Sequence, residues 1–418
     1  MKFVLKISAD LFFYNIIKTE GVQDIMNAAA FGKKYAEWLT PQNIIAMLAV
    51  SCYAPFVFTA IAIAVSLVLI LLIPEYQRGL FNFRGAFFIP AFCIYAMAVA
   101  FFARNALGMI VAPVFFSLLV LMCFVRCNIT EKTFEKCCAA VCAMVIPATL
   151  YAVCEALTAT SDNGKVYRCA SYFANANYFG ALLAAAIILC ARQVIKRKGK
   201  APFYFVSAFF ALLGIYLSAS LFAVIEVVVG VAVYLLFSKH YRLFSLMVIV
   251  GSVGILLITG IPELLPRLSE SGDATGYRVR IWGVALRELS GHPFFGKGFM
   301  SYAEIHGLYE GSYETVHGHN LALDSLLNFG IFGTMILLLL ICFVLRLVVR
   351  VYLHDTNSEP AAVIIAVSCA VFAHCFTDIT FFWIQTGMFY LFIIGSIGFE
   401  EKRLGLKNDM LLCGRYRI

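Results

Sequence analysis

Long apolar runs recur along the chain between positions 42 and 398, with short polar stretches between them. A helix of about 20 apolar residues crosses the roughly 30 Å hydrocarbon core of a bilayer. Pro55 and Ser218–Ser220 divide the two runs that are too long for one span. Twelve spans are predicted, at 42–54, 56–73, 86–103, 106–125, 137–158, 177–191, 202–217, 221–237, 243–260, 325–345, 361–379 and 381–398. The runs lack the alternation of a membrane barrel, so we predict an all-α fold, a polytopic transmembrane helical bundle.

The distribution of lysine and arginine predicts the orientation of these spans. With the N-terminus inside, 24 basic residues lie in inner segments and 8 in outer segments. Inner loops of membrane proteins carry the excess of basic residues, so both termini are predicted to be cytoplasmic. The parts are a cytoplasmic-face amphipathic segment at 1–41, spans one to nine at 42–260, a large extracytoplasmic loop at 261–324, spans ten to twelve at 325–398 and a basic cytoplasmic tail at 399–418.

Composition supports a lipid bilayer as the surroundings of the chain. Of its 418 residues, 62% are hydrophobic and 13% are charged, whereas soluble domains are about half apolar and a quarter charged. The net charge of +8 comes from basic residues that bracket the spans, so we expect no nucleic-acid partner. The 14 cysteines lie mostly inside spans, which argues against a disulfide framework.

One amphipathic helix is predicted within the large loop. Thr275 can cap a helix over 276–290, and Gly291 with Pro293 ends it. At 100° per residue, Arg278 shares a face with Ile281, Trp282, Ala285, Leu286 and Leu289, whereas Arg280 and Arg287 lie on the opposite face. Because a buried, unpaired cation is costly, Arg278 should meet an anion. The pattern leaves open whether that anion is a carboxylate or a bound phosphate.

Histidines gather at the end of the same loop. Four of the seven histidines lie within 261–324, and His317 and His319 precede Asn320 just before the tenth span. Histidine is the side chain best suited to proton transfer near neutral pH. The His-x-His pair also suits zinc, but the sequence offers no obvious third ligand, so we predict no metal. A structural hydrogen-bonding role for His319 stays open, and Asn320 can orient a neighbouring group.

Ionisable residues within the spans form a second set of candidates. Glu155, Glu226 and Asp378 lie in outer halves of predicted spans, where charged groups often serve function. His374 and Asp378 are four residues apart on one predicted helix, so we expect them to contact each other. Helix–helix hydrogen bonding is the alternative role for this pair.

The loop resembles the O-antigen ligase and O-antigen polymerase family of membrane enzymes. The segment GYRVRIWGVALRELSGHPFFGKG resembles the family's Arg-x-x-x-Trp helix and Pro-x-x-Gly-x-Gly turn, and HNLALDSLLNFGIFG resembles its His-Asn and Gly-x-x-Gly elements. In YRCASYFANANYFGALL, Arg168, Asn175 and Asn177 fit the family's Arg and Asn-Pro-Asn element, with Ala176 in place of proline. One departure is clear, because Leu221 stands where the family usually has an arginine.

The resemblance implies a bacterial plasma-membrane enzyme of surface-polysaccharide assembly. It implies a polyprenyl-pyrophosphate-linked glycan donor, a glycan, lipid or protein hydroxyl acceptor, and an inverting glycosyl transfer without cofactor or metal. Arg278 would hold the pyrophosphate, with Arg280 in reserve, and His319 would act on the acceptor hydroxyl, with His317 in reserve. Arg104 or Arg168 could take the role of the arginine that Leu221 replaces.

Two other functions stay open at this point. Twelve spans also suit a transporter of lipid-linked sugar or small solutes, although such proteins often show internal repeats and none is visible here. A scaffold for export-complex proteins is the third possibility. The sequence does not distinguish a ligase from a polymerase.

Overall fold

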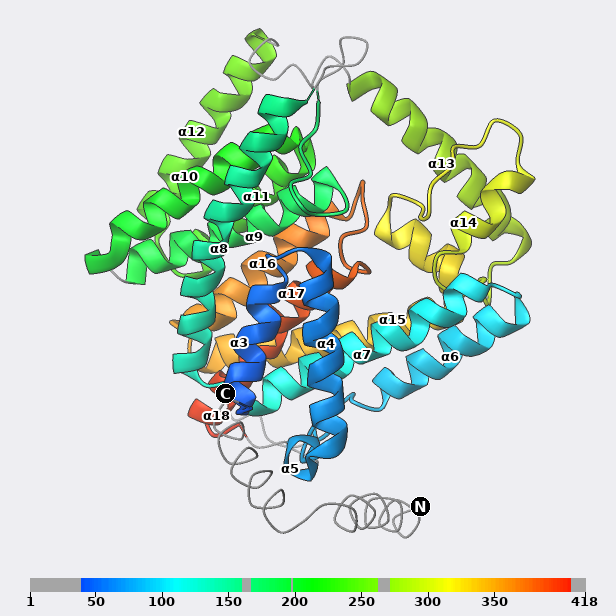
Figure 1. Ribbon diagram of the computed structural model, residues 1–418, viewed down its shortest axis with the longest axis horizontal. Helices are drawn as coiled ribbons and strands as arrows, with labels where there is room; N and C mark the ends of the chain where they lie inside the picture. Colours follow the sequence, from blue (N-terminus) through cyan, green and yellow to red (C-terminus); the bar gives the residue numbers. More distant parts are fainter. Residues whose placement is uncertain (1–38, 160–166, 197, 262–270, 407–418) are drawn as a thin grey trace, which may run out of the picture. The chain divides into compact units, whose positions relative to one another are not determined.

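The computed structural model describes residues 39–159, 167–196, 198–261 and 271–406, which contain helices and no strand (Figure 1). The chain divides into two compact units at residue 44, and the helices discussed here lie in the second unit apart from the start of α3. In chain order the α-helices are α3 (Pro41–Ser51), α4 (Phe56–Leu72), α5 (Pro74–Gln77), α6 (Phe88–Phe102), α7 (Ala106–Asn128), α8 (Glu131–Thr158), α9 (Ala176–Lys196), α10 (Ala201–Ser218), α11 (Leu221–Phe237), α12 (Tyr241–Gly260), α13 (Ser271–Gly291), α14 (Ser301–Ile305), α15 (Leu321–His354), α16 (Glu359–His374), α17 (Ile384–Gly395) and α18 (Ile397–Arg403).

Each predicted span overlaps one of these helices, which confirms an all-helical fold for the described residues. Five helices are long and apolar enough to cross a membrane, namely α7, α8, α9, α10 and α15. Five shorter apolar helices accompany them, so the count of twelve spans and the position of the termini stay predictions. Most of the predicted segment 1–41 and most of the predicted tail lie outside the described residues.

Helix α9 lies at the centre of the packing. It contacts α8, α10, α11 and α16, and 83% of its most apolar window is buried, compared with 22% for α15. Several helices begin at residues whose side-chain oxygen accepts a backbone N–H, which satisfies an otherwise unpaired donor. These caps are Asn105, Thr130, Ser220, Asn320 and Ser358.

The predicted extracytoplasmic loop is built around α13, which packs against α15 (Figure 1). Helix α13 begins at Ser271, so the predicted start at Gly276 with Thr275 as its cap was wrong; Thr275 lies inside the helix. The buried face of α13 forms a small core with α14 and the start of α15. Its members are Ile281, Val284, Ala285, Tyr302, Ile305 and Leu327, with Trp282, Tyr309 and Leu323 packed against it.

Helix α15 is broken at Gly330, and the Pro293–Gly298 turn lies against the break. Gly330 has φ +61° and ψ −171°, outside the helical region. Backbone groups freed by the break bond to the turn: Gly298 N donates to the carbonyl of Asn328 at 2.6 Å, and Ile331 N donates to the carbonyl of Pro293 at 2.9 Å. Irregular backbone in a membrane protein is tolerated where protein groups satisfy it in this way.

The last predicted spans end differently from the expectation. Helix α16 ends at His374, nine residues before the N-cap of α17 at Trp383. Asp378 therefore lies in the turn between these helices, and the prediction that it lies on a helix over 361–379 was wrong. The predicted tail begins inside α18, where Arg126 of α7 forms an ion pair with Glu401 at 2.7 Å.

Candidate functional site

The turn between α16 and α17 brings together residues from distant parts of the chain. Asp378 is 1% exposed, and its Oδ1 lies 3.4 Å from His319 Nδ1 and 3.5 Å from His317 Nε2. Its other oxygen, Oδ2, accepts a hydrogen bond of 2.5 Å from Asn177 Nδ2 at the start of α9. Asp378 is therefore the residue at which the loop histidines meet the helical bundle.

The contacts of the two histidines indicate different roles for their rings. His317 is buried, and its Nδ1 accepts the backbone N–H of His319 at 3.3 Å, so the proton of its neutral ring lies on Nε2 and faces Asp378. His319 is 21% exposed, and its Nε2 lies 3.3 Å from Thr315 Oγ1. His319 also has φ +49°, a left-handed conformation that is uncommon outside glycine and is concentrated at functional sites.

Burial and charge set the ionisation of this cluster. Burial lowers the pKa of His317 to about 4 despite the opposing effect of Asp378, so His317 is neutral at pH 7. Burial would raise the pKa of Asp378, but its interactions with His319 and the other neighbouring histidines hold the pKa below its usual range. Asp378 is thus a carboxylate that can stabilise positive charge on His319.

Arg278 reaches the same turn from α13. Its Nε donates a hydrogen bond of 3.1 Å to the backbone carbonyl of Thr377, next to Asp378, and its guanidinium lies over the Phe222 ring at 5.4 Å. Arg278 is partly buried, whereas Arg280 and Arg287 are exposed. The predicted separation of the arginines between two faces is therefore confirmed, although Leu286, expected on the Arg278 face, is 56% exposed.

Arg168 connects Asn177 to the α10–α11 turn. It donates through Nη2 to Asn177 Oδ1 and through Nε to the carbonyl of Ser218, the latter at 3.2 Å. Leu221 begins α11 immediately after this turn. Arg168 and Arg278 thus contact residues on the two sides of this turn, Ser218 at the end of α10 and Phe222 at the start of α11, next to Leu221, which stands in place of the family's usual arginine.

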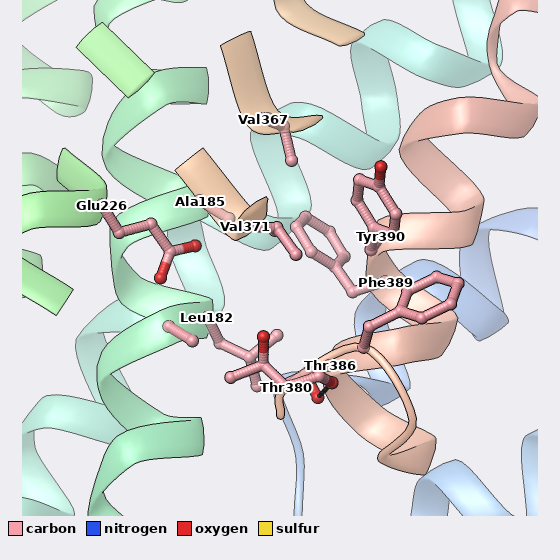
Figure 2. A pocket seen from close by; sticks show the side chains of 11 residues that line it. Leu182, Ala185, Glu226, Val367, Val371, Thr380, Thr386, Phe389 and Tyr390 are labelled. Carbon is pink, nitrogen blue, oxygen red and sulfur yellow. Dashed lines mark hydrogen bonds between the residues drawn. The ribbon is translucent and has the colours of Figure 1, made fainter. Parts of the chain in front are cut away.

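Glu226 and His374 form a separate, fully buried pair. His374 Nδ1 lies 2.7 Å from Glu226 Oε2, so His374 pairs with α11, and the predicted side-chain contact with Asp378 was wrong because α16 ends before Asp378. Glu226 also borders a cavity of about 10 Å³, which has room for about one water molecule. Figure 2 shows Glu226 entering this cavity from α11 and Thr386 entering it from α17.

The remaining predicted residues have positioning contacts. Asn320 caps α15 through Leu323 N at 3.0 Å and donates to the carbonyl of Phe376 at 3.0 Å, so it joins the loop to the Asp378 turn. Trp282 packs on the small core of the loop. Arg104 is exposed and has φ +57°; its neighbour Asn105 donates to the carbonyls of Lys297 and Phe299, which ties this turn to the Gly298 region.

The structure also supplies the third potential metal ligand that the sequence did not reveal. One ligand atom from each of His317, His319 and Asp378 lies within 4.8 Å of the other two. Asp378 is 59 residues beyond His319, so no local spacing rule could have connected them.

Three contributing residues were absent from the predicted site. Asn177 holds Asp378, Thr377 accepts from Arg278, and Phe222 lies under the Arg278 guanidinium. Only Asn177 had a sequence signal, as part of the segment that resembles the family's Asn-Pro-Asn element.

Comparison with known families finds a match in the second half of the chain. Residues 203–338 match the family model described as O-antigen ligase, which confirms the resemblance carried by the loop motifs. The matched segment includes Arg278, His317 and His319, while Asp378 and Asn177 lie outside it. The match and the apolar helices indicate a multi-pass bacterial membrane protein with an O-antigen ligase-like function in surface-polysaccharide assembly. No curated protein matches the chain.

Proposed function

From the O-antigen ligase match as premise, we propose that this protein transfers a glycan from a polyprenyl-pyrophosphate lipid to a hydroxyl acceptor at the outer face of the bacterial plasma membrane. The observation that carries the proposal is the convergence at one turn of Arg278, His319 and Asp378. Arg278 bonds to the carbonyl of Thr377, and the adjacent Asp378 lies 3.4 Å from His319. A cation and a proton acceptor thus contact neighbouring residues of one turn.

Arg278 holds the pyrophosphate of the donor. Its planar guanidinium matches phosphate oxygens in geometry and charge, and Phe222 together with the Thr377 carbonyl fixes its orientation. The Thr377 hydroxyl is buried and has no hydrogen-bond partner within the described part of the chain, so it can donate to a phosphate oxygen beside Arg278. Both groups stabilise the negative charge that develops on the leaving pyrophosphate.

His319 accepts the proton of the acceptor hydroxyl. Its Nδ1 faces Asp378, which places the ring proton there and leaves the Nε2 lone pair toward Thr315 and the partly exposed side of the ring. The acceptor oxygen attacks the anomeric carbon, and the bond from that carbon to the phosphate oxygen breaks. The bonding electrons leave with the lipid pyrophosphate, the hydroxyl proton goes to Nε2, and Asp378 stabilises the resulting imidazolium. A single displacement inverts the anomeric configuration and needs no metal.

The test uses the purified full-length protein with a synthetic polyprenyl-pyrophosphate glycan. The enzyme should consume the donor, release polyprenyl pyrophosphate and produce a glycan of inverted anomeric configuration. A donor that stays chemically intact but crosses a vesicle membrane would support the transporter instead. The size distribution of surface polysaccharide in a deletion strain distinguishes the two acceptor classes: loss of long chains indicates a polymerase, and unattached lipid-linked polymer indicates a ligase.

A further inference from the structure

The His317, His319 and Asp378 side chains have the spacing of a metal centre. The distances from Asp378 Oδ1 to His317 Nε2 and His319 Nδ1 are 3.5 and 3.4 Å. Ligands of a tetrahedral zinc ion with bonds of about 2.0–2.1 Å are separated by about 3.4 Å. Two of the three ligand separations therefore fit an ion with little movement, and the third is no greater than 4.8 Å.

Burial and hydrogen bonding keep these atoms directed at a common point. The His317 and Asp378 side chains are 5% and 1% exposed, and the His319 side chain is 21% exposed. Two of the three groups are therefore buried in the protein, and the third is accessible to solvent. Asn177 holds the second oxygen of Asp378, as outer-shell groups do in metal sites. His319 Nδ1 is buried and makes no hydrogen bond of good geometry to any described residue. A metal ion can therefore replace the proton on this nitrogen and bind the lone pair that is left.

We infer that His317, His319 and Asp378 bind a divalent transition-metal ion of the zinc class, with a fourth position open to water. Two imidazoles and a carboxylate suit zinc, cobalt, nickel or copper better than magnesium or calcium. When His317 binds the metal through Nε2, its ring proton moves to Nδ1. Nδ1 then no longer accepts the backbone N–H of His319, so the metal bond replaces that 3.3 Å hydrogen bond.

Metal binding at this site inhibits glycan transfer, a consequence that rests on the proposed function. A metal on His319 Nδ1 takes the place of the proton that faces Asp378. The neutral ring then carries its proton on Nε2, and Nε2 has no lone pair for the acceptor hydroxyl. The same ion also neutralises the Asp378 carboxylate that would stabilise the imidazolium.

The binding test uses cobalt as a spectroscopic probe of the full-length protein in detergent after treatment with a chelator. Wild type should bind one equivalent of Co²⁺ with the intense visible bands of tetrahedral coordination, and Zn²⁺ should displace it. His317→Gln should weaken binding at least tenfold. His317→Cys restores a ligand and should add a sulfur-to-cobalt charge-transfer band. His292→Gln, in the same loop but outside the cluster, is the matched control and should bind like wild type.

Three results would overturn the metal site: no tetrahedral spectrum, equal binding by His317→Gln, or loss of binding by His292→Gln. Thermal melting of each variant checks that it is folded. In the transfer assay Zn²⁺ should inhibit wild type, a chelator should restore activity, and the residual activity of His317→Gln should resist Zn²⁺. Cobalt binding without transfer under any condition contradicts the proposed function alone. Transfer without cobalt binding contradicts the metal site alone, and transfer that a chelator abolishes contradicts the inhibitory role.

Discussion

At the scale of single residues, two uncharged residues connect the charged groups of the candidate site. Asn177 joins Arg168 to Asp378, and Thr377 joins Arg278 to the same turn through its backbone carbonyl. The Asn177–Asp378 and Arg278–Thr377 links cross 201 and 99 positions of sequence, so the site depends on tertiary contacts that ordinary polar residues make. These links define which substitutions should matter.

Replacing Arg278 by alanine should reduce transfer at saturating donor by about a hundredfold, the scale of losing one transition-state donor. Arg287→Ala is the matched control, because Arg287 is on the same helix and exposed, and its kcat should stay within twofold of wild type. Donor consumption by purified protein measures both. Equal effects of the two substitutions would indicate general electrostatics instead of a placed arginine.

Asn177→Ala should lower kcat about tenfold, the equivalent of losing a hydrogen bond to a charged group, with little change in the KM for the lipid donor. The reason is that Asn177 orients Asp378 and makes no contact in the proposed phosphate site. Steady-state kinetics separates the two constants. A large rise in KM with unchanged kcat would instead place Asn177 on the donor.

At the scale of elements, the break in α15 and the Pro293–Gly298 turn form one unit. A Cβ at Gly330 would lie 2.3 Å from the carbonyl of Phe294, and a Cβ at Gly296 would lie 2.6 Å from the carbonyl oxygen of Asn328. Both glycines also have positive φ. The turn can therefore approach the helix only where side chains are missing on both partners.

Gly330→Ala should lower the free energy of unfolding by about 2–4 kcal/mol, because strain and a backbone clash add together. Gly283→Ala is the control: beyond its chain neighbours and the backbone of its own helix, no atom lies within 4 Å of its added Cβ, and alanine in mid-helix should stabilise by up to about 1 kcal/mol. Melting in detergent compares them. A Gly330→Ala protein as stable as wild type would show that the Pro293–Gly298 turn does not pack against α15 at Gly330.

Glu288 gives the loop a pH-dependent stability. Burial raises its pKa, but hydrogen bonds from Lys297 and Tyr309, with the charge of Lys297, outweigh burial and lower the pKa. A lowered pKa in the folded state stabilises the protein above the unfolded pKa of about 4.3. The advantage of wild type over Glu288→Gln in melting temperature should be full at pH 7 and shrink as the pH falls through the folded-state pKa. A pH-independent difference would contradict this role.

At the scale of the whole molecule, the basic residues counted on the inner side of the membrane do not all lie at the protein surface. The basic stretch 192–200 (RQVIKRKGK) forms the turn between the sixth and seventh predicted spans, and Arg192 begins it. Arg192 is fully buried and pairs with Glu135 at 2.6 Å and Glu359 at 3.5 Å. It therefore holds α8, α9 and α16 together instead of facing lipid headgroups. The other basic residues of this turn, together with the excess of lysine and arginine in the other inner segments, still predict that the turn is cytoplasmic.

Cysteine labelling tests the orientation. In a variant whose 14 native cysteines are serine, Glu310→Cys should react with a membrane-impermeant maleimide in intact cells. Gly199→Cys in the α9–α10 turn should react only after the membrane is opened. Both positions are exposed, so access alone decides the result. The reverse pattern would place the candidate site in the cytosol, away from donor and acceptor.

The sequence determined the helical architecture and part of the site. Apolar runs marked the helices because each bilayer-length helix must be apolar along its own length, and all predicted spans overlap observed helices. The 3.6-residue period separated Arg278 from Arg280 and Arg287. Helix ends that were predicted from the local sequence were less accurate. The predicted start of α13 and the predicted end of α16 were wrong by several residues, because these helices begin at Ser271 and end at His374.

Tertiary structure alone decided the partners of the ionisable groups. His374 and Asp378 share a local spacing, yet His374 pairs with Glu226 and Asp378 lies near His317 and His319. The physical reason is that α16 ends at His374 and the turn after it directs the Asp378 side chain toward Asn177 and the loop histidines, while His374 faces Glu226 on α11. Burial then required each charge to find a partner, and packing of α9, α11 and α13 around one turn supplied those partners from segments with no local relation in sequence.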